Sequence, residues 1–157
     1  MTRDEFALRV QNSRKDLYLA ALSVVRNAED AKDAVSEAVT IAWEKLDRLK
    51  DDGKFDGWLL KILYNEAKDI YRKNRQRNDE ADLSDAFSYD AGIENVGFYD
   101  MLNRCGFDEK TMRILIMRFV YDMTLQRISY ETGMPEATVK TKYYRALKKL
   151  SETEGLR

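Results

Sequence analysis

Residues 124–149 read TLQRISYETGMPEATVKTKYYRALKK, and this stretch decides the fold of the C-terminal part of the chain. It predicts two helices joined by a tight turn. Thr124 suits the N-cap of the first helix, and Gly133 can supply the left-handed backbone that often ends a helix. Pro135 suits the start of the second helix, where its missing N–H costs nothing. A short helix, a glycine-containing turn and a basic second helix are typical of a helix-turn-helix that enters a DNA major groove.

The second helix of this stretch has two different sides. Helical spacing predicts an inward stripe that consists of Val139, Tyr143, Ala146, Leu147 and Leu150. Side chains that can donate hydrogen bonds or stack on bases share the other side: Lys140, Thr141, Tyr144, Arg145 and Lys148. A charged side that is only solvated is the alternative interpretation.

Charge is unevenly distributed, although the 157 residues carry a formal net charge of only −1. Residues 61–77 hold six Lys or Arg against two acids, and residues 136–149 hold five against one. Residues 78–100 hold seven acids and no basic residue. We therefore expect two DNA-contacting domains, residues 1–77 and 96–157, joined by an acidic linker at residues 78–95. A solvated tether explains the linker more simply than a specific binding segment does.

Composition argues against several classes of protein. Cys105 is the only cysteine, so no disulfide can form within the chain, and there is no histidine. Histidine-based catalysis and the usual zinc ligand sets are therefore excluded, and no enzymatic activity, metal or cofactor is expected. Neither a basic-then-apolar signal nor an apolar run of membrane-spanning length is found, which predicts a cytoplasmic protein.

Helical periodicity extends over most of the chain, and a single proline with seven glycines argues against a β-rich fold. We expect an all-α protein of two small helical domains, the C-terminal one a helix-turn-helix bundle. Asp108 is the expected N-cap of a helix at 109–121, with Phe107 and Met112 as its hydrophobic staple. The other helices are predicted at residues 4–26 (one long or two short), 31–49, 56–75 and 96–104, with a loop at 50–56.

Three motifs, in order along the chain, resemble those of one family. Residues 31–43, AKDAVSEAVTIAW, resemble the second conserved region of sigma-70-type transcription initiation factors. Residues 55–69, FDGWLLKILYNEAKD, with the basic run after them, resemble the adjoining promoter-melting part. Residues 134–146 are similar to the helix-turn-helix of the fourth region. The order of the motifs, the two-domain length and the missing middle domain resemble the small extracytoplasmic-function (ECF) group.

The resemblance implies that residues 48–55 and one face of the next helix meet the melted promoter element nearest the start site, the downstream (−10) element. Melting needs a pocket for an extruded base, and cationic and aromatic surface for the opened strand. Asn65 would read a base edge and Tyr64 would stack, whereas Trp58 is expected to pack in the core. The assigned residues are Lys61, Tyr64, Asn65, Lys68, Asp69, Arg72 and Arg75.

The resemblance also implies a docking face for core RNA polymerase on the helix predicted at 31–49. In such factors this helix binds the clamp helices of the largest polymerase subunit. The contact residues would be Asp33, Ser36, Glu37 and Thr40, with Asp30 near the edge of the face. The alternative is that these residues form only the solvated side of an amphipathic helix.

In the helix-turn-helix, Lys140, Thr141, Tyr144 and Arg145 fall where the family contacts the upstream (−35) element. Phosphate contacts are assigned to Arg127, Thr138, Lys142 and Lys148. Some positions depart from the family pattern. Ser36 and Val39 stand where glutamine and an aromatic residue are common, and Phe107-Asp108 replaces the usual Leu-Pro opening of the fourth region.

We therefore expect a transcription initiation factor that binds core RNA polymerase, recognises two promoter elements and assists DNA melting. The alternative is a stand-alone helix-turn-helix regulator that blocks or recruits without melting DNA. A third class is a helical module whose basic faces bind acidic protein partners. The expected partners are core RNA polymerase and promoter DNA, and an anti-sigma protein is a further candidate partner.

Overall fold

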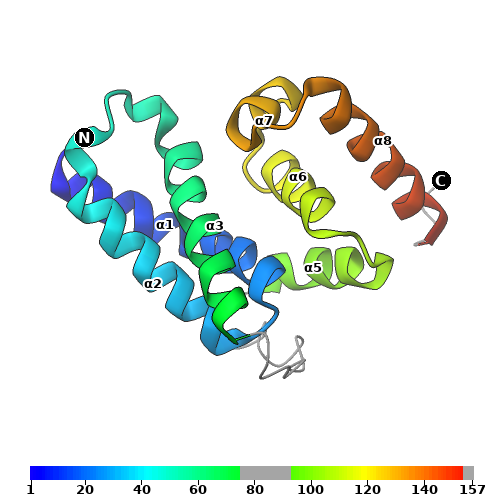
Figure 1. Ribbon diagram of the computed structural model, residues 1–157, viewed down its shortest axis with the longest axis horizontal. Coiled ribbons are helices and arrows are strands. Elements are labelled where there is room, and N and C mark those ends of the chain that lie inside the picture. The colour runs from blue at the N-terminus through cyan, green and yellow to red at the C-terminus, as the bar shows by residue number, and fades with distance from the viewer. Residues whose placement is uncertain (75–92, 154–157) are drawn as a thin grey trace. The chain divides into compact units, whose positions relative to one another are not determined.

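The computed structural model describes residues 1–74 and 93–153, and the chain divides between Gly92 and Ile93 into two compact units (Figure 1). All regular secondary structure in these described ranges is helical, which confirms the all-α prediction. The predicted acidic linker at 78–95 lies outside the described residues except for its last three. Its role as a linker therefore stays a prediction.

The first unit is a bundle of three helices. They are α1 (Arg3–Val25), α2 (Ala28–Glu44) and α3 (Phe55–Asn74), and each packs against the other two (Figure 1). The N-terminal region thus forms one long helix rather than two short ones. Two short 3-10 turns lie between α2 and α3: η1 (Leu46–Arg48), within the stretch predicted as the end of a helix, and η2 (Asp52–Lys54), within the predicted loop.

Side-chain caps fix where the first two helices begin. Thr2 Oγ1 accepts a hydrogen bond from the Glu5 N–H at 3.1 Å, and Glu5 Oε1 accepts one from the Thr2 N–H at 3.1 Å. This reciprocal capping box starts α1, and its hydrogen bonds from Thr2 lower the pKa of Glu5. At α2, the Asn27 side chain accepts from the Asp30 N–H at 3.0 Å, so the helix begins at Ala28.

The predicted bounds of α2, residues 31 to about 49, are therefore wrong at both ends. The capped first turn adds residues before Ala31, and the helix ends at Glu44, where the chain tightens into η1. The inward face of α2 is correct, because four alanines on it are almost completely buried: Ala31, Ala34, Ala38 and Ala42. Such small side chains allow a close approach of the neighbouring helices.

The second unit contains α5 (Ile93–Cys105), α6 (Glu109–Phe119), α7 (Leu125–Thr132) and α8 (Glu136–Thr153), and α8 packs against the other three. Asp108 Oδ1 accepts from the Thr111 N–H at 2.9 Å, which confirms the predicted cap of α6. The helix α5 begins before the predicted Val96, and α6 ends before the predicted residue 121. No helix in the described ranges is both long and apolar enough to cross a membrane.

Candidate nucleic-acid interface

The turn between α7 and α8 is held by hydrogen bonds of its own residues. Thr124 Oγ1 accepts from the Arg127 N–H at 3.0 Å, so α7 starts at the predicted cap. Gly133 has a φ of 77°, and its N–H donates to Ser129 O at 2.9 Å. The Ser129 hydroxyl donates to Met134 O at 2.6 Å. These contacts fix the direction in which the chain enters α8, and a side chain at position 133 would strain the left-handed backbone.

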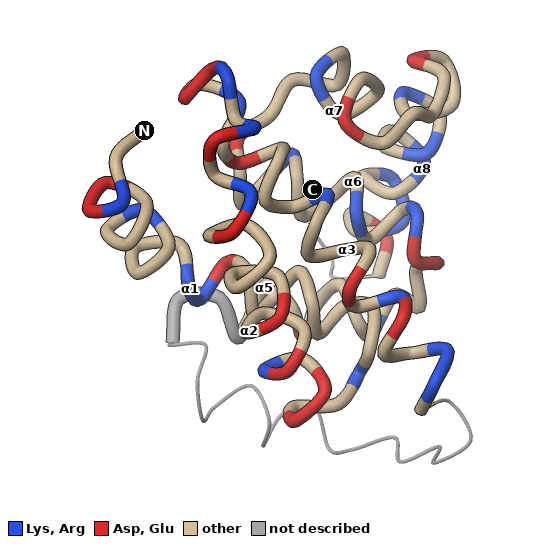
Figure 2. Tube along the Cα trace, turned by 60° about the vertical axis from the view of Figure 1, so that its left-hand side comes forward, with Lys and Arg blue, Asp and Glu red and all other residues tan. Residues whose placement is uncertain are grey.

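The two sides of α8 lie as the sequence predicts. The inward stripe is buried at Val139, Tyr143, Ala146 and Leu150, and half-buried at Leu147. The predicted groove-reading side is exposed throughout: Lys140, Thr141, Tyr144, Arg145 and Lys148. Lys and Arg recur along α8 in Figure 2. The second helix of the motif thus presents a basic surface containing one aromatic ring, Tyr144, which is 60% exposed.

Several basic residues assigned to DNA contacts already face carboxylates. Lys140 Nζ lies 3.2 Å from Glu136 Oε2, and Arg127 Nε lies 3.1 Å from Glu131 Oε1. Thr138 and Arg127 are half-buried. A DNA phosphate would compete with these carboxylates for the cations, most readily at the exposed Lys140–Glu136 pair, since surface ion pairs are individually weak. The pairs therefore orient the cations without removing them from the surface.

Lys142 has a different neighbour, the cap of α6. Its Nζ lies 3.7 Å from Asp108 Oδ2, and its side chain is 29% exposed. The hydrogen bonds from Thr111 and, to a smaller extent, the Lys142 charge lower the pKa of Asp108 below its ordinary value of 3.8. Lys142 is therefore displaced sideways from the outer side of α8, as its predicted phosphate contact requires.

In the first unit, one face of α3 brings together most residues assigned to the downstream element. Helical spacing places on this face Lys61, Asn65, Lys68, Asp69 and Arg72, of which Lys68 is half-buried and the others are exposed. Asp69 Oδ1 accepts a hydrogen bond from Arg72 Nη1 at 3.3 Å, so these two residues form an ion pair on the surface of α3. Arg75 lies outside the described residues.

Tyr64 does not share this face. It is only 3% exposed and lies on the buried side of α3 with Leu60 and Leu63, so the prediction that its ring stacks on a base is wrong for this conformation. Trp58, expected in the core, is half-buried and lies three residues before Lys61 on the outer face. The helical spacing of residues 58, 61 and 65 indicated already in the sequence that Trp58 lies on the same face as Lys61 and Asn65. Trp58 therefore places an aromatic side chain on the same face of α3 as these cations.

The face assigned to polymerase docking on α2 is exposed at Asp33, Ser36, Glu37 and Thr40. The edge residue Asp30 is instead 8% exposed, and its Oδ1 accepts a hydrogen bond from Asn74 Nδ2 at 3.3 Å. Asp30 thus links the start of α2 to the end of α3, and its predicted place near the contact face is wrong. The Asn27 cap places Asp30 in the first turn of α2.

A groove of about 320 Å³, which was not predicted from the sequence, lies beside this face. Its lining comes from α1 and α2 and consists of Arg14, Tyr18, Lys32, Val35 and Ser36. The groove combines cationic and apolar side chains. Within the described residues, no group of three or more Cys, Asp or Glu side chains could hold a metal ion.

Two family models match the chain. Sigma-70 region 2 matches residues 10–77, and Sigma-70, region 4 matches residues 108–150. The RNA polymerase sigma factor SigV of Bacillus subtilis (strain 168) is 30% identical over 142 residues, which cover 88% of this chain and 84% of the relative. The ECF RNA polymerase sigma factor EcfG of Rhodopseudomonas palustris (strain TIE-1) is 29% identical over 142 residues, which cover 83% and 75%.

Among solved structures, the sigma factor RpoE of Bartonella quintana, crystallised with the anti-sigma factor NepR, has a similar fold. It superposes with a TM-score of 0.68 at 22% identity, over 94% of this chain and 95% of that one. The region 2 match lies within the first unit of the fold, and the region 4 match lies within the second. The chain belongs to the sigma-70 family, as an ECF-type sigma factor that directs RNA polymerase to promoters.

Proposed function

We propose that the outer side of α8 reads the upstream (−35) promoter element. The observation that carries this proposal is the exposure of its five polar residues opposite a buried stripe on the second helix of a helix-turn-helix. Arg145 and Thr141 lie one turn apart on this side and can reach base edges, and Tyr144 can pack on a thymine methyl. Arg127, Thr138, Lys142 and Lys148 hold phosphates around the groove.

The outer face of α3 and the segment before it meet the downstream (−10) element. Lys61, Lys68 and Arg72 attract the strand backbone, and Asn65 can pair with a base edge. Trp58 takes the stacking role that Tyr64, being buried, cannot take from its present position. Cationic surface beside an aromatic ring suits an opened strand better than a closed duplex, which supports a role in melting.

The exposed polar face of α2 binds the clamp helices of the largest polymerase subunit. The exposure of four polar side chains on this face supports the assignment: Asp33, Ser36, Glu37 and Thr40. Chemistry then belongs to the polymerase, the factor itself needs no catalytic group, and its place of action is the cytoplasm. An anti-sigma protein that covers this face would restrain the factor.

Binding to labelled promoter duplex, measured with and without core polymerase, tests this function against its alternative. We expect specific binding only when core polymerase is present, because the two elements must be read together and the downstream one as a melted strand. A duplex with both elements scrambled is the control. Specific, polymerase-independent binding of the chain to its duplex would instead favour a stand-alone helix-turn-helix regulator.

A further inference from the structure

The N-terminal part of α1 contacts both ends of the segment that joins α2 to α3. We call residues 45–54 the connecting loop, and Arg3, Phe6 and Arg9 together the α1 clamp. The clamp residues are spaced three apart, so they lie along one side of α1. Phe6 is 2% exposed, whereas the two arginines flank it with partly exposed side chains.

Phe6 lies between two aromatic rings that mark the ends of the connecting loop. Its centroid is 5.7 Å from that of Trp43, near the end of α2, and 5.8 Å from that of Phe55, the first residue of α3. Both contacts are edge-to-face, at interplanar angles of 62° and 84°. This geometry is favourable for aromatic pairs, so a single buried ring joins the last turn of α2 to the first turn of α3.

A guanidinium group lies over each of the two outer rings. Arg3 Cζ lies 4.4 Å from the Trp43 ring centroid, and Arg9 Cζ lies 4.6 Å from that of Phe55. Both distances are within the range of favourable cation–π contacts. The result is a continuous row of five side chains in the order Arg3, Trp43, Phe6, Phe55, Arg9.

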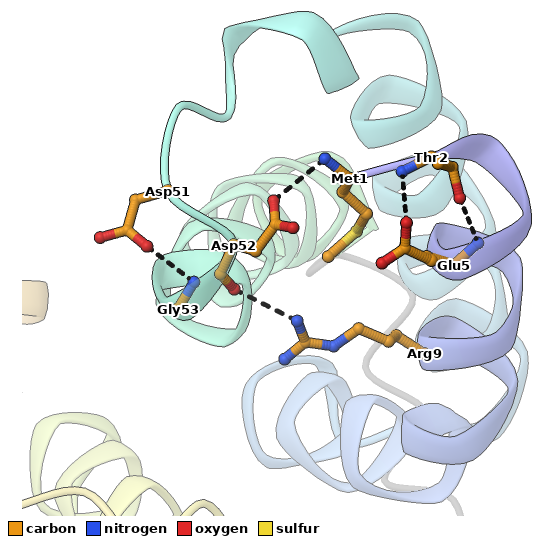
Figure 3. Close-up of polar contacts among 7 residues, drawn as sticks. All are labelled: Met1, Thr2, Glu5, Arg9, Asp51, Asp52 and Gly53. Carbon is orange, nitrogen blue, oxygen red and sulfur yellow. Dashed lines mark hydrogen bonds and ion pairs between the residues drawn. The ribbon is translucent and has the colours of Figure 1, made fainter.

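Polar contacts extend the clamp to the backbone of the connecting loop (Figure 3). Arg9 Nη1 donates to Asp52 O at 3.2 Å, and Arg9 Nη2 lies 3.9 Å from Asp56 Oδ1. The Met1 amino group lies 3.1 Å from Asp52 Oδ1. At the other end, Arg3 Nη1 donates to the Trp43 carbonyl oxygen in the last turn of α2, and Arg3 Nη2 lies 3.9 Å from Asp47 Oδ1 in the loop. The N-terminal turns of α1 therefore hold the loop at both ends.

The connecting loop has few anchors of its own. Of its ten residues, all of them described, only Leu46 is buried. The Gly53 N–H donates to Asp51 Oδ1 at 2.9 Å, and this contact lies at the surface (Figure 3). A segment with one buried side chain and exposed hydrogen bonds opens easily unless its neighbours hold it. The contacts from α1 thus add to the turn hydrogen bonds of the loop and to the packing of its two 3-10 turns on α2 and α3.

We propose that the α1 clamp fixes the shape of the connecting loop and thereby sets how well the factor discriminates between bases of the downstream element. This inference rests on the proposed function, in which the loop and α3 meet the melted strand. The clamp residues are positioning residues, and the buried Phe6 is out of reach of DNA. A surface shaped before binding distinguishes ligands better than one that must be ordered by each of them.

The first measurement is hydrogen exchange of the connecting-loop amides in the purified full chain. In Arg9→Ala we expect these amides to exchange about tenfold faster, with α2 and α3 unchanged, because only the local opening becomes easier. Arg9→Lys keeps the charge and should restore part of the protection. Lys15→Ala removes an exposed charge farther along α1 and is the matched control. Unchanged loop exchange in Arg9→Ala would overturn the proposal.

The second measurement is transcription with core polymerase from promoters that carry single-base changes in either element. Arg9→Ala and Phe6→Leu should each reduce discrimination at downstream positions about fivefold or more, while the ranking of upstream bases stays as in the wild type. A loss by Arg9→Ala that is equal for all sequences, with a lower salt dependence, would identify a phosphate contact and overturn the proposal. If the wild-type chain directs no transcription, the proposed function itself is wrong. If the wild type is active and both variants discriminate between downstream bases as it does, only the proposed role of the clamp is wrong.

Discussion

Arg145 and Lys142 lie three positions apart on α8, and their surroundings differ. Arg145 is exposed on the outer side of α8 and makes no hydrogen bond or ion pair with another described residue. Lys142 is half-buried beside Asp108. Helical spacing alone predicted this difference. An exposed guanidinium on the groove side can form two hydrogen bonds to a guanine edge, and a lysine displaced sideways meets the backbone.

Arg145→Ala and Lys142→Ala should therefore impair promoter use in different ways. Loss of Arg145 should cost about 1–3 kcal/mol of binding and relax the preference at one upstream base pair. Loss of Lys142 should weaken binding to all sequences alike and lower the salt slope by about one. Transcription from single-base upstream variants at several salt concentrations measures both effects. If Arg145→Ala keeps the wild-type ranking of bases, α8 does not read them through this residue.

Tyr64 is buried and Trp58 is half-buried on the outer face of α3, whereas the sequence favoured the opposite arrangement of the two rings. Apolar and aromatic residues alternate too closely along α3 for composition to tell an inward ring from an outward one. Only the phase of the helix decides, and it is set by packing against α1 and α2. The cations of this face were predictable because charged side chains are rarely buried.

Tyr64→Ala should lower the free energy of unfolding by about 3–5 kcal/mol, since it empties a buried site. Trp58→Ala should cost less stability but impair promoter opening, because a stacked base is worth about 1–3 kcal/mol. Urea unfolding measures the first effect, and permanganate reactivity of unpaired thymines measures the second. Normal opening with Trp58→Ala would exclude this ring from the melted strand.

At the scale of helices, caps were the most predictable features and helix ends the least. Thr124, Gly133 and Asp108 have the predicted capping roles, because each depends on a local hydrogen bond or backbone angle. The early start of α2 reflects the cap that the Asn27 side chain forms with the Asp30 N–H. The end of α2 did not follow from the sequence, since the chain tightens there into η1, which no side-chain cap marks.

The cap of α6 gives a pH-dependent contribution to stability. The pKa of Asp108 is lower in the folded state, so its charge stabilises the fold above about pH 4, and this stabilisation is lost as the pH falls through the folded pKa. Asp108→Ala should cost about 1 kcal/mol near neutral pH. Asp108→Asn keeps the cap without the charge, and its difference from the wild type should disappear in acid. Urea titrations at several pH values, followed by NMR of the α6 amides, measure both. A pH-independent difference for Asp108→Asn would contradict this role of the charge.

The exposed face of α2 predicts how charge reversal acts on polymerase binding. Asp33→Arg or Glu37→Arg should weaken affinity for core polymerase by about tenfold or more, because like charges would then meet across the interface. Both side chains are exposed, so the fold should persist. Glu152→Arg makes the same charge change on an exposed position of the other unit and should leave the affinity unchanged. Wild-type affinity in a titration of Asp33→Arg and Glu37→Arg would mean that this face is only solvated.

For the whole molecule, the sequence predicted the order of two helical units and the two basic surfaces, one on each unit. Both depend on patterns within short segments. The connection of α1 to the loop between α2 and α3 was not predictable, because its contacts join residues about forty positions apart. Resemblance to the family's conserved regions assigned the surfaces that we propose to be functional, and only the packed fold shows that Tyr64 and Asp30 are buried.

The two units should fold independently. Residues 1–77 and 93–157, produced separately, should each unfold cooperatively in urea, since the helices of each unit pack against one another. The far-UV circular dichroism of the two fragments should add up to that of the intact chain. Loss of helicity in either fragment would show that it depends on the other.

The central claim is that this chain directs core RNA polymerase to promoters by reading two elements, one with each unit. The most direct test is transcription in vitro from a library randomised over both elements, with core polymerase alone and with the chain added. We predict that adding the chain selects promoters that share two short sequences at a fixed spacing. Within that selection, Arg145→Ala should relax only the upstream sequence and Trp58→Ala should affect only the downstream one. A library profile that is the same with and without the chain would contradict the claim.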